Sequence, residues 1–288
     1  MTKRYENNSV CELSIIVPIY NGEDYIERKI ESLQGIKNLS YEVVISLNKS
    51  DDKTEEIIDT MVGDDLNFKI IKQSNFLPGL ENYKRGFDQS KGTFIMASAV
   101  DDICDKNFYR EAIAMLNEER CVIAVSPQTL FSDNSHGNQP IDFEVRGSTE
   151  KRLTTLFENI RVSHGIFYSL MRRETACELN LNYVSDYSFI GGDWLFDTRL
   201  ALKGEIRRIN HSKCVFGVKG ISKSKNYFYG PSMNLAQQIF PYRTLAKELI
   251  KMARKLEYKS RLTLYLFAYG LLKGNIHRFV TQRVFKKK

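Results

Sequence analysis

The chain has 288 residues, 42% of them apolar, and a formal net charge of +7, which is enough sequence to bury one large core and to carry a small appendage. The charge is uneven, because residues 241–288 hold 13 Lys or Arg against two acids, a net of +11, while the other 240 residues sum to −4. The five cysteines are scattered and never spaced as Cys-x-x-Cys, which argues against a disulfide framework or a zinc site and favours a reducing cytoplasm.

Strand and helix patterns alternate through the first 120 residues. Short apolar runs predict strands at 13–19, 41–47, 68–72 and 93–99. Segments of mixed charge between them predict helices near 23–34, 52–62, 79–90 and 105–118. Helical crossovers between consecutive strands make those strands parallel neighbours. The sequence therefore predicts an α/β fold with a Rossmann-like, mostly parallel central sheet flanked by helices.

The pattern is less regular after residue 125. Turn-forming residues at 126–150 predict a long loop that contains a strand at 141–146. The elements expected beyond this loop are a helix at 150–160, a strand at 165–171, a helix from Asp193 to Lys203, and short strands at 205–209 and 214–218. These last elements would close the sheet.

Two adjacent carboxylates, Asp101 and Asp102, come just after the hydrophobic run that predicts the 93–99 strand. The carboxyl ends of strands in an open α/β sheet form the edge at which ligands bind. Paired carboxylates at this edge suit a divalent cation that is held against phosphate oxygens. The same pair is also suited to cap a helix that begins near Lys106, and spacing alone does not separate the two roles.

Further segments follow the order of one protein family. They are Pro18-Ile-Tyr20-Asn21 at the end of the first strand, Tyr41 to Ser46, Asn48 to Thr54, Asn82-Tyr-Lys-Arg85, and the Asp pair. Together these segments resemble the family 2 glycosyltransferases, which have the GT-A fold and transfer a sugar from a nucleotide diphosphate sugar. The resemblance covers residues 12–120 well and continues more loosely to about 220.

The resemblance implies a nucleotide site over the first two strand ends. The residues expected to contact the base or the ribose are Pro18, Tyr20, Asn21 and Glu23. If the resemblance is set aside, the same residues are typical of a turn between a strand and a helix. The second strand of the family usually ends in an Asp that binds uracil, whereas this chain has Leu47 followed by Asn48. Either Asn48 substitutes for that Asp or the base differs, so donors built on UDP, dTDP or GDP stay open.

The departing diphosphate develops negative charge, which a bound Mn²⁺ or Mg²⁺ offsets; one or two carboxylates suffice because phosphates and waters complete the shell. By resemblance, Asp102 is the metal ligand, and Asp101 contacts the ribose or a metal-bound water. The family often has a further acidic residue where this chain has Val100. Asn82 and Arg85 are three residues apart on one helix and should share a face. They are expected to contact the ribose or diphosphate, with a solvated helix face as the alternative.

Inversion at the anomeric carbon needs a general base that takes the proton from the attacking hydroxyl. In Gly191-Gly-Asp193-Trp194, Asp193 begins a helix at the position where family members commonly have this base. Trp194, the only tryptophan in the chain, would offer an apolar face to an acceptor sugar. Asp197, one turn later, is the second candidate for the base. A helix-capping Asp beside a core Trp is the structural alternative.

The basic tail, residues 241–288, predicts two helices, Tyr242 to Leu256 and Tyr258 to Lys273. Its uncharged run from Leu262 to Leu272 is shorter than the ~18 apolar residues of a membrane-spanning helix. Cations beside an apolar, aromatic face fit a helix that lies on an anionic membrane. A helical hairpin packed on the catalytic domain and a homodimer interface are the alternatives.

These features predict a GT-A catalytic domain at 1–225, in which 12–120 bind the nucleotide sugar and 121–225 hold the acceptor and the base, and a helical tail at 226–288. The expected activity is inverting, metal-assisted sugar transfer to a growing bacterial surface glycan or lipid-linked acceptor at the cytoplasmic face of a membrane; no secretory signal is visible. The alternative is a degenerate, non-catalytic member or a protein that binds an anionic surface or nucleic acid. Nucleic acid is not expected as a partner, because the basic charge is confined to the tail.

Overall fold

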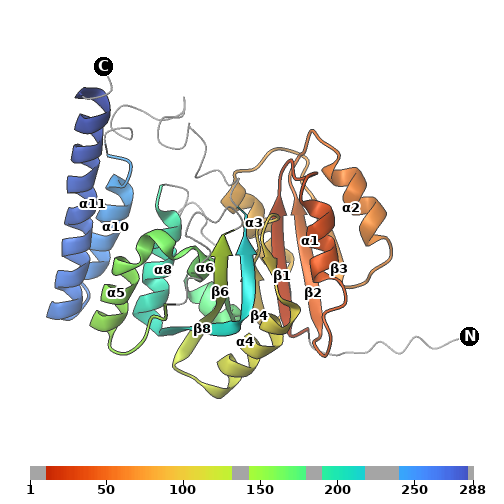
Figure 1. Cartoon of the computed structure of the whole chain (residues 1–288), viewed down its shortest axis with the longest axis horizontal. Coiled ribbons are helices and arrows are strands. Elements are labelled where there is room, and N and C mark those ends of the chain that lie inside the picture. Colours follow the sequence, from red (N-terminus) through yellow and green to blue (C-terminus); the bar gives the residue numbers. More distant parts are fainter. Residues whose placement is uncertain (1–10, 132–142, 180–189, 218–239, 285–288) are drawn as a thin grey trace, which may run out of the picture.

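A mixed sheet forms the centre of the fold. The computed structural model describes residues 11–131, 143–179, 190–217 and 240–284, and within them eight strands form one sheet in the order β3-β2-β1-β4-β7-β6-β8-β5 (Figure 1). The strands are β1 (Leu13–Ile19), β2 (Tyr41–Leu47), β3 (Phe68–Lys72), β4 (Phe94–Ala97), β5 (Ile103–Cys104), β6 (Val122–Phe131), β7 (Leu170–Arg172) and β8 (Glu205–Phe216). The helices are α1 (Ile26–Leu33), α2 (Thr54–Val62), α3 (Gly79–Gln89), α4 (Lys106–Glu118), α5 (Thr149–Glu158), η1 (Ile160–Val162), α6 (His164–Phe167), α7 (Arg173–Glu178), α8 (Gly192–Lys203), α10 (Arg243–Ala253) and α11 (Tyr258–Val284).

Strands β1 to β4 run parallel, and their carboxyl ends meet at one edge of the sheet. In register, Ile19 of β1 lies opposite Leu47 of β2, and Leu47 lies opposite Lys72 of β3. On the other side of β1, Ile16 lies opposite Ala97 of β4. β1 and β2 are buried along almost their whole length, as apolar parallel strands usually are. The register brings the loops after β1, β2 and β4 to the edge where the sequence predicts the site.

Helices cover both faces of the sheet. Alternate residues of β1 supply two cores, since Ile15 belongs to the first and Ile16 to the second. Helices α1, α2 and α4 pack around the first core, which includes Ile30. Helices α3, α5 and α8 pack around the second, which includes Phe87 and Leu200. The predicted mostly parallel sheet flanked by helices is confirmed.

At two places where the sequence predicts the end of a strand, the strand continues in the structure. Residues 126–131 extend β6 despite the turn-forming Pro127, because a register shift between Pro127 and Gln128 accommodates the proline in the ladder. The polar residues in the middle of β8 do not end it, because the pairing moves from Ile209 to Lys213 across the same shift. The predictions of a loop at 126–131 and of two separate strands in β8 are therefore wrong.

The predicted strand at 165–171 is helical in its first half. α6 spans His164–Phe167, and strand β7 begins only at Leu170, because a short apolar run does not distinguish a buried strand from a buried helical turn. The strand predicted at 141–146 lies partly outside the described residues. Within its described part, Val145 makes a single bridge to β8.

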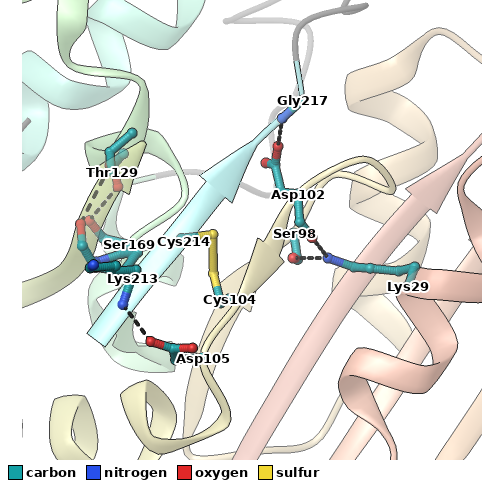
Figure 2. The surroundings of a disulfide bond; sticks show 12 residues. Lys29, Ser98, Asp102, Cys104, Asp105, Thr129, Ser169, Lys213, Cys214 and Gly217 are labelled. Carbon is teal, nitrogen blue, oxygen red and sulfur yellow. Dashed lines mark hydrogen bonds between the residues drawn. A yellow bond between two sulfur atoms is a disulfide. The ribbon is translucent and has the colours of Figure 1, made fainter. Parts of the chain in front are cut away.

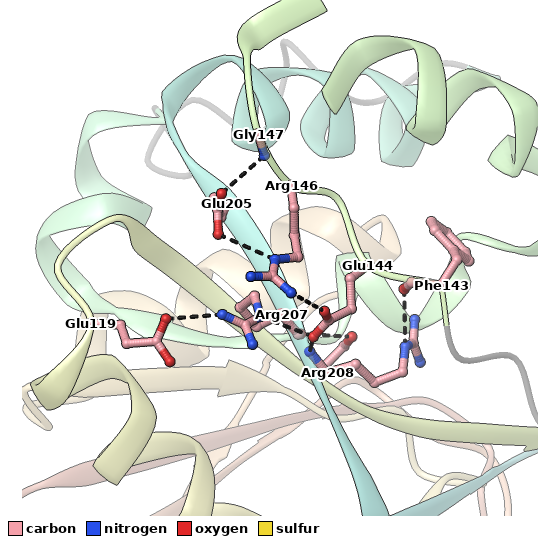
Figure 3. A network of polar contacts seen from close by, with 9 residues as sticks. Glu119, Phe143, Glu144, Arg146, Gly147, Glu205, Arg207 and Arg208 are labelled. Carbon is pink, nitrogen blue, oxygen red and sulfur yellow. Dashed lines mark hydrogen bonds and ion pairs between the residues drawn. The ribbon is translucent and has the colours of Figure 1, made fainter. Parts of the chain in front are cut away.

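Ion pairs fasten the 143–147 segment to β8 (Figure 3). Arg207 of β8 pairs with Glu144 at 3.0 Å and with Glu119 at 2.9 Å. Arg146 pairs with Glu144 at 3.4 Å and with Glu205 at 3.7 Å. These side chains alternate in sign along two neighbouring segments, so the network holds the segment that follows residue 142 against the sheet.

A disulfide joins Cys104 of β5 to Cys214 of β8, which lie opposite each other in an antiparallel pair (Figure 2). The expectation that the cysteines form no disulfide is wrong for this pair. The two residues are 110 positions apart, so their spacing in the sequence gives no sign that they meet. The remaining cysteines, Cys11, Cys121 and Cys177, are free.

The C-terminal helices α10 and α11 lie side by side next to α5 and α8 (Figure 1). α10 contributes Leu245 and Leu249 to the second core, and α11 contributes Leu264 and Ala268. Both helices therefore pack on the second core, which agrees with the hairpin alternative for the tail. The predicted boundary at 225/226 falls outside the described residues. No helix in the described part of the chain is both long and apolar enough to span a membrane.

Candidate functional site

The Asp pair occupies the turn between β4 and β5, at the carboxyl edge of the sheet. Figure 2 shows Asp102 in this turn. Asp102 is 4% exposed; its Oδ1 accepts a hydrogen bond from the backbone N–H of Gly217 at 3.0 Å, and its Oδ2 is buried without a hydrogen-bond partner among the described residues. Burial raises the pKa of Asp102 to about 7, although the charge of Lys29 and the bond from Gly217 lower it. Asp101 is half-buried beside it.

A buried lysine, Lys29 of α1, anchors this turn (Figure 2). Its Nζ donates to Ser98 Oγ at 2.5 Å and to the backbone carbonyl of Asp102 at 2.6 Å. Burial lowers the pKa of Lys29 to about 8, while the charges of Asp102 and Asp101 raise it. Sequence reasoning missed Lys29, although it carries a signal. It occupies a buried position of an amphipathic helix, together with Ile26, Ile30 and Leu33.

The Asp pair does not cap α4. That helix begins at Lys106 after Asp105, and no side chain caps it. The partnerless Oδ2 of Asp102 fits one ligand position of a divalent cation, because a buried carboxylate oxygen is otherwise costly. Among the described residues, no group of three His, Cys, Asp or Glu side chains is placed to share an ion. The residues therefore fit a metal that takes its other ligands from phosphate oxygens and water.

The loops that follow β1 and β2 are joined by hydrogen bonds in both directions. Asn21 Oδ1 accepts from the N–H of Asp51 at 2.9 Å, and Glu23 Oε2 accepts from the N–H of Lys53 at 3.0 Å. The N–H groups of Asn21 and Glu23 in turn donate to side chains of residues 50–52, each at 3.1 Å. Two residues predicted to contact the nucleotide therefore also fix the two loops relative to each other.

Tyr20 is 45% exposed at the end of β1, whereas Pro18 is half-buried opposite Ser46 of β2. The ring of Tyr20 meets that of Phe76 edge to face, with 5.0 Å between centroids, and Phe76 is 59% exposed. Two exposed rings at the ligand edge offer an apolar surface of the kind on which nucleobases stack. Sequence reasoning missed Phe76, because a single aromatic residue in a loop carries no pattern.

Asn48 and Asn82 are buried, and their amides are bonded to the protein. Asn48 holds the next loop, since its Oδ1 accepts from the N–H of Leu77 at 2.9 Å and its Nδ2 donates to the carbonyl of Leu77 at 2.7 Å. Asn82 Nδ2 donates to the carbonyl of Ser46 and its Oδ1 accepts from the Ser46 hydroxyl, both at 2.8 Å. Arg85, three residues later on α3, is exposed.

Asp193 lies in the first turn of α8 and is half-buried. It does not cap the helix, because the N-cap residue is Gly191 and no side chain makes a cap bond. Gly191 has a φ of 86°, and a Cβ there would lie 2.9 Å from the side chain of Leu245, so only glycine suits this close approach. Trp194 stacks on Tyr242, with 5.2 Å between ring centroids. One face of the indole is therefore covered by the tail.

Asp197, the second candidate for the base, is 1% exposed. Its Oδ2 lies 2.7 Å from Ser163 Oγ, and its Oδ1 has no hydrogen-bond partner among the described residues. Burial raises the pKa of Asp197 well above its usual range. A buried carboxyl group in this position is shielded from an acceptor hydroxyl, which favours Asp193.

Tyr168 connects the Asp pair to Asp193. Burial raises the pKa of its hydroxyl, and the charges of Asp102, Asp101 and Asp193 raise it further. The charges of all three carboxylates therefore act on the same buried hydroxyl. The ring of Tyr168 also lies 5.6 Å from that of Phe216, at the end of β8. Sequence reasoning missed Tyr168, since its apolar surroundings predicted only a strand.

Comparison with known proteins extends this picture. The family described as Glycosyl transferase family 2 matches residues 14–178. A Campylobacter jejuni protein named GalNAc(5)-diNAcBac-PP-undecaprenol beta-1,3-glucosyltransferase is 30% identical over 92 residues, which are 32% of this chain and 30% of the relative. The match therefore spans less than a third of that relative's length.

Solved structures share the fold. Residues 1–349 of TarS from Staphylococcus aureus, in complex with UDP-GlcNAc, match with a TM-score of 0.57 at 16% identity over 92% of this chain and 81% of that chain. A mannosyltransferase from Pyrobaculum calidifontis, in complex with GDP-Man and Mn²⁺, matches with a TM-score of 0.56 at 14% identity over 95% of this chain and 75% of that chain. The predicted GT-A fold is confirmed. Since the family match covers more than half of the residues, the chain belongs to glycosyltransferase family 2 and is a glycosyltransferase.

Proposed function

We propose that the protein is an inverting, metal-assisted glycosyltransferase that moves a sugar from a nucleotide diphosphate sugar to a hydroxyl of its acceptor. The observation that carries the proposal is the Asp pair at the carboxyl edge of the sheet, where the buried Oδ2 of Asp102 has no hydrogen-bond partner among the described residues. The Asp pair for the departing diphosphate and Asp193 for the attacking hydroxyl would supply the two roles that this reaction needs.

The Asp pair would hold the donor. Asp102 would present its buried Oδ2 to Mn²⁺ or Mg²⁺, while Gly217 and Lys29 keep the carboxylate and its backbone in place. The bound metal would offset the negative charge of the departing diphosphate. Asp101, half-buried beside it, is placed for the ribose or a metal-bound water. The Mn²⁺ in the P. calidifontis complex supports this role for the pair.

Asp193 would act as the general base. As the acceptor oxygen bonds to the anomeric carbon, the bond from that carbon to the phosphate oxygen breaks, and the hydroxyl proton passes to the Asp193 carboxylate. Its half-buried position in the first turn of α8 supports this role over that of buried Asp197. Trp194, which Tyr242 covers on one face, would offer its remaining surface to the acceptor sugar.

The nucleotide would lie over the loops after β1 and β2, with its base against Tyr20 and Phe76. Hydrogen bonds of Asn21, Glu23, Asn48 and Asn82 hold the loops and strands of this region in place. Together with Pro18, these residues are the proposed contacts of the nucleotide. Arg85 is exposed and available to phosphate. UDP, dTDP and GDP donors all fit this scheme, and the complexes of TarS with UDP-GlcNAc and of the mannosyltransferase with GDP-Man support the first and the last.

The acceptor would be a growing bacterial surface glycan or a lipid-linked precursor, met at the cytoplasmic face of the membrane by a peripheral enzyme. The C. jejuni relative, which is named for a substrate linked to undecaprenol, supports an acceptor of this class. The TarS relative is named for poly(ribitol-phosphate), and it supports a polymeric acceptor.

A thermal-shift screen of UDP, dTDP, GDP and CMP, each with and without Mn²⁺ or Mg²⁺, tests the donor site. A ligand at about 100 times its Kd stabilises by roughly 2.7 kcal/mol, which moves the midpoint of a domain of this size by several degrees. We expect one nucleoside diphosphate to give a metal-dependent shift that Asp102→Asn abolishes and Asp193→Asn preserves. Asp193→Asn should instead abolish sugar transfer. A chain that shifts with no nucleotide would support the degenerate, non-catalytic alternative.

A further inference from the structure

Helix α11 has two apolar faces. One face packs into the protein, where Leu264 and Ala268 are buried and Phe267 stacks on Phe157 of α5 with 3.9 Å between ring centroids. The other face carries residues that are 36–74% exposed, namely Tyr258, Leu262, Tyr265, Leu266 and Tyr269. Their spacing of three, four, seven and eight positions places them along one side of a helix. We call these five residues the tyrosine stripe.

The tyrosine stripe concentrates the exposed apolar surface of the protein. Nine large hydrophobic residues are exposed in the described part of the chain, and five of them belong to the stripe. The other four are the contacting pair Tyr20 and Phe76, Leu66 in the loop before β3, and Val215 of β8. Scattered apolar residues are normal on a surface, whereas a contiguous apolar band marks an interaction site.

The positive charge of α11 around the tyrosine stripe favours a negatively charged partner. The sequence of α11 contains five Lys or Arg and no Asp or Glu. Two of the cations, Lys259 and Lys273, are exposed and border the stripe near its two ends. A second copy of the chain would set these cations against each other across a two-fold axis, so self-association is disfavoured. The complementary partner is negatively charged and has an apolar interior.

We propose that the tyrosine stripe and its flanking cations bind the surface of an anionic membrane. Tyrosine rings place an apolar body in the acyl boundary and a hydroxyl in the headgroup layer, and lysines bind anionic headgroups. Figure 1 shows α11 as the outermost element, with α10 and α5 on its inner side, so the helix can lie along the membrane over its length. α10 has no comparable face, because its apolar residues are buried in the second core or partly buried against it.

Membrane binding through the tyrosine stripe would place the enzyme at the membrane surface. Only this consequence, and not the binding itself, rests on the proposed function. An enzyme that lies on the membrane through α11 meets acceptors that are carried on lipids in the same plane. The binding itself needs neither donor nor acceptor, so the two proposals can be tested separately.

Flotation of the full chain with vesicles tests the surface, without any nucleotide or acceptor present. The unmodified protein should float with vesicles that contain phosphatidylglycerol and remain unbound with pure phosphatidylcholine. Leu262→Ser, Leu266→Ser and Tyr269→Ser combined should weaken binding by at least about tenfold. Leu66→Ser is the matched control, because Leu66 is 99% exposed outside the stripe, and it should bind as the unmodified protein does. Lys259→Gln and Lys273→Gln should each lower affinity by on the order of fivefold.

Three outcomes would overturn the proposal. They are no binding to anionic vesicles by the unmodified protein, full binding by the triple variant, and a dimer in light scattering that the triple variant converts to a monomer. The nucleotide thermal shift is measured on the same samples. If nucleotides bind while vesicles do not, the membrane surface fails alone. If vesicles bind while no nucleotide does, the proposed function fails alone.

Discussion

The backbone N–H of Gly217 donates to Oδ1 of Asp102 at 3.0 Å, across 115 positions of sequence. Gly217 directly follows β8, and Asp102 directly precedes β5, so this bond and the Cys104–Cys214 disulfide join the same two strands (Figure 2). The carboxylate that is the candidate metal ligand is therefore oriented by β8 as well as by β4. Changes in β8 should affect donor binding even where they do not touch the donor.

Gly217→Ala tests this dependence. A Cβ at Gly217 would lie 1.8 Å from Asp101 Oδ2, so Asp101 or the backbone must move. We expect metal-dependent nucleotide binding to weaken at least about tenfold, since displacement of one carboxylate of the pair disturbs both contacts with the donor. Isothermal titration with the nucleotide identified by thermal shift measures the loss. Gly270→Ala is the control, because a Cβ there meets nothing within 4 Å, and affinity equal to that control would contradict the prediction.

Lys29→Met should destabilise the fold around the Asp pair. The change removes the donor to Ser98 Oγ and to the Asp102 carbonyl, and buried acceptors that lose their donor cost about 1–3 kcal/mol. The pKa of Asp102 should also rise further, because a neighbouring positive charge is lost. Urea unfolding at constant pH measures the free energy of unfolding. The exposed Lys37→Met should change it little, and equal midpoints for the two variants would show that Lys29 contributes no stability.

The sequence predicted the N-terminal half of the fold well, because its information there is local. Strands 13–19, 41–47 and 68–72 match β1, β2 and β3, since each is a continuous apolar run between helical segments. β6 and β8 were harder, because a proline and a polar stretch normally end a strand. Their ladder continues through a register shift that depends on the partner strand, and one strand's sequence does not contain that information.

In the candidate site, too, some residues could be predicted from local sequence patterns and others could not. Asp101, Asp102 and Asp193 follow local patterns of a strand end and a helix start, and in the structure the pair follows β4 and Asp193 lies in the first turn of α8. Lys29 and Gly217 act on that site from distant parts of the chain. Their roles are tertiary contacts, which residue type and spacing do not encode.

Reduction should lower the stability of the protein through the Cys104–Cys214 bond. A cross-link between residues 110 positions apart restricts the unfolded chain, and such bonds typically contribute about 2–4 kcal/mol. We expect a lower thermal midpoint in dithiothreitol and the same decrease in Cys104→Ser. Cys121→Ser, which changes a free and exposed cysteine, should have no effect. Thiol titration of protein unfolded without reductant should find three reactive cysteines, Cys11, Cys121 and Cys177; five would show that the bond does not form.

Asp197 should make stability depend on pH. Ser163 Oγ lies within hydrogen-bond distance of both Asp197 Oδ2, at 2.7 Å, and the Ile160 carbonyl, at 3.0 Å, but it has one proton. A protonated Asp197 satisfies all three groups by donating to Ser163, which then donates to Ile160. Burial raises the pKa of folded Asp197, so its stabilising contribution is complete below the unfolded pKa of about 3.9 and is lost as pH rises through the folded value.

Asp197→Asn should remove this dependence. In one pH range Asp197 is ionised in the unfolded chain but protonated in the folded protein. In that range the free energy of unfolding of the unmodified protein should fall with rising pH, by up to about 1.4 kcal/mol per pH unit more than that of the variant. The variant should therefore be the more stable protein at pH 8, since an amide needs no proton to remain neutral. Chemical unfolding from pH 5 to pH 8 measures both curves. Asp24→Asn, at an exposed position, should follow the unmodified protein, and a curve for Asp197→Asn parallel to that control would mean that Asp197 is ionised in the folded state.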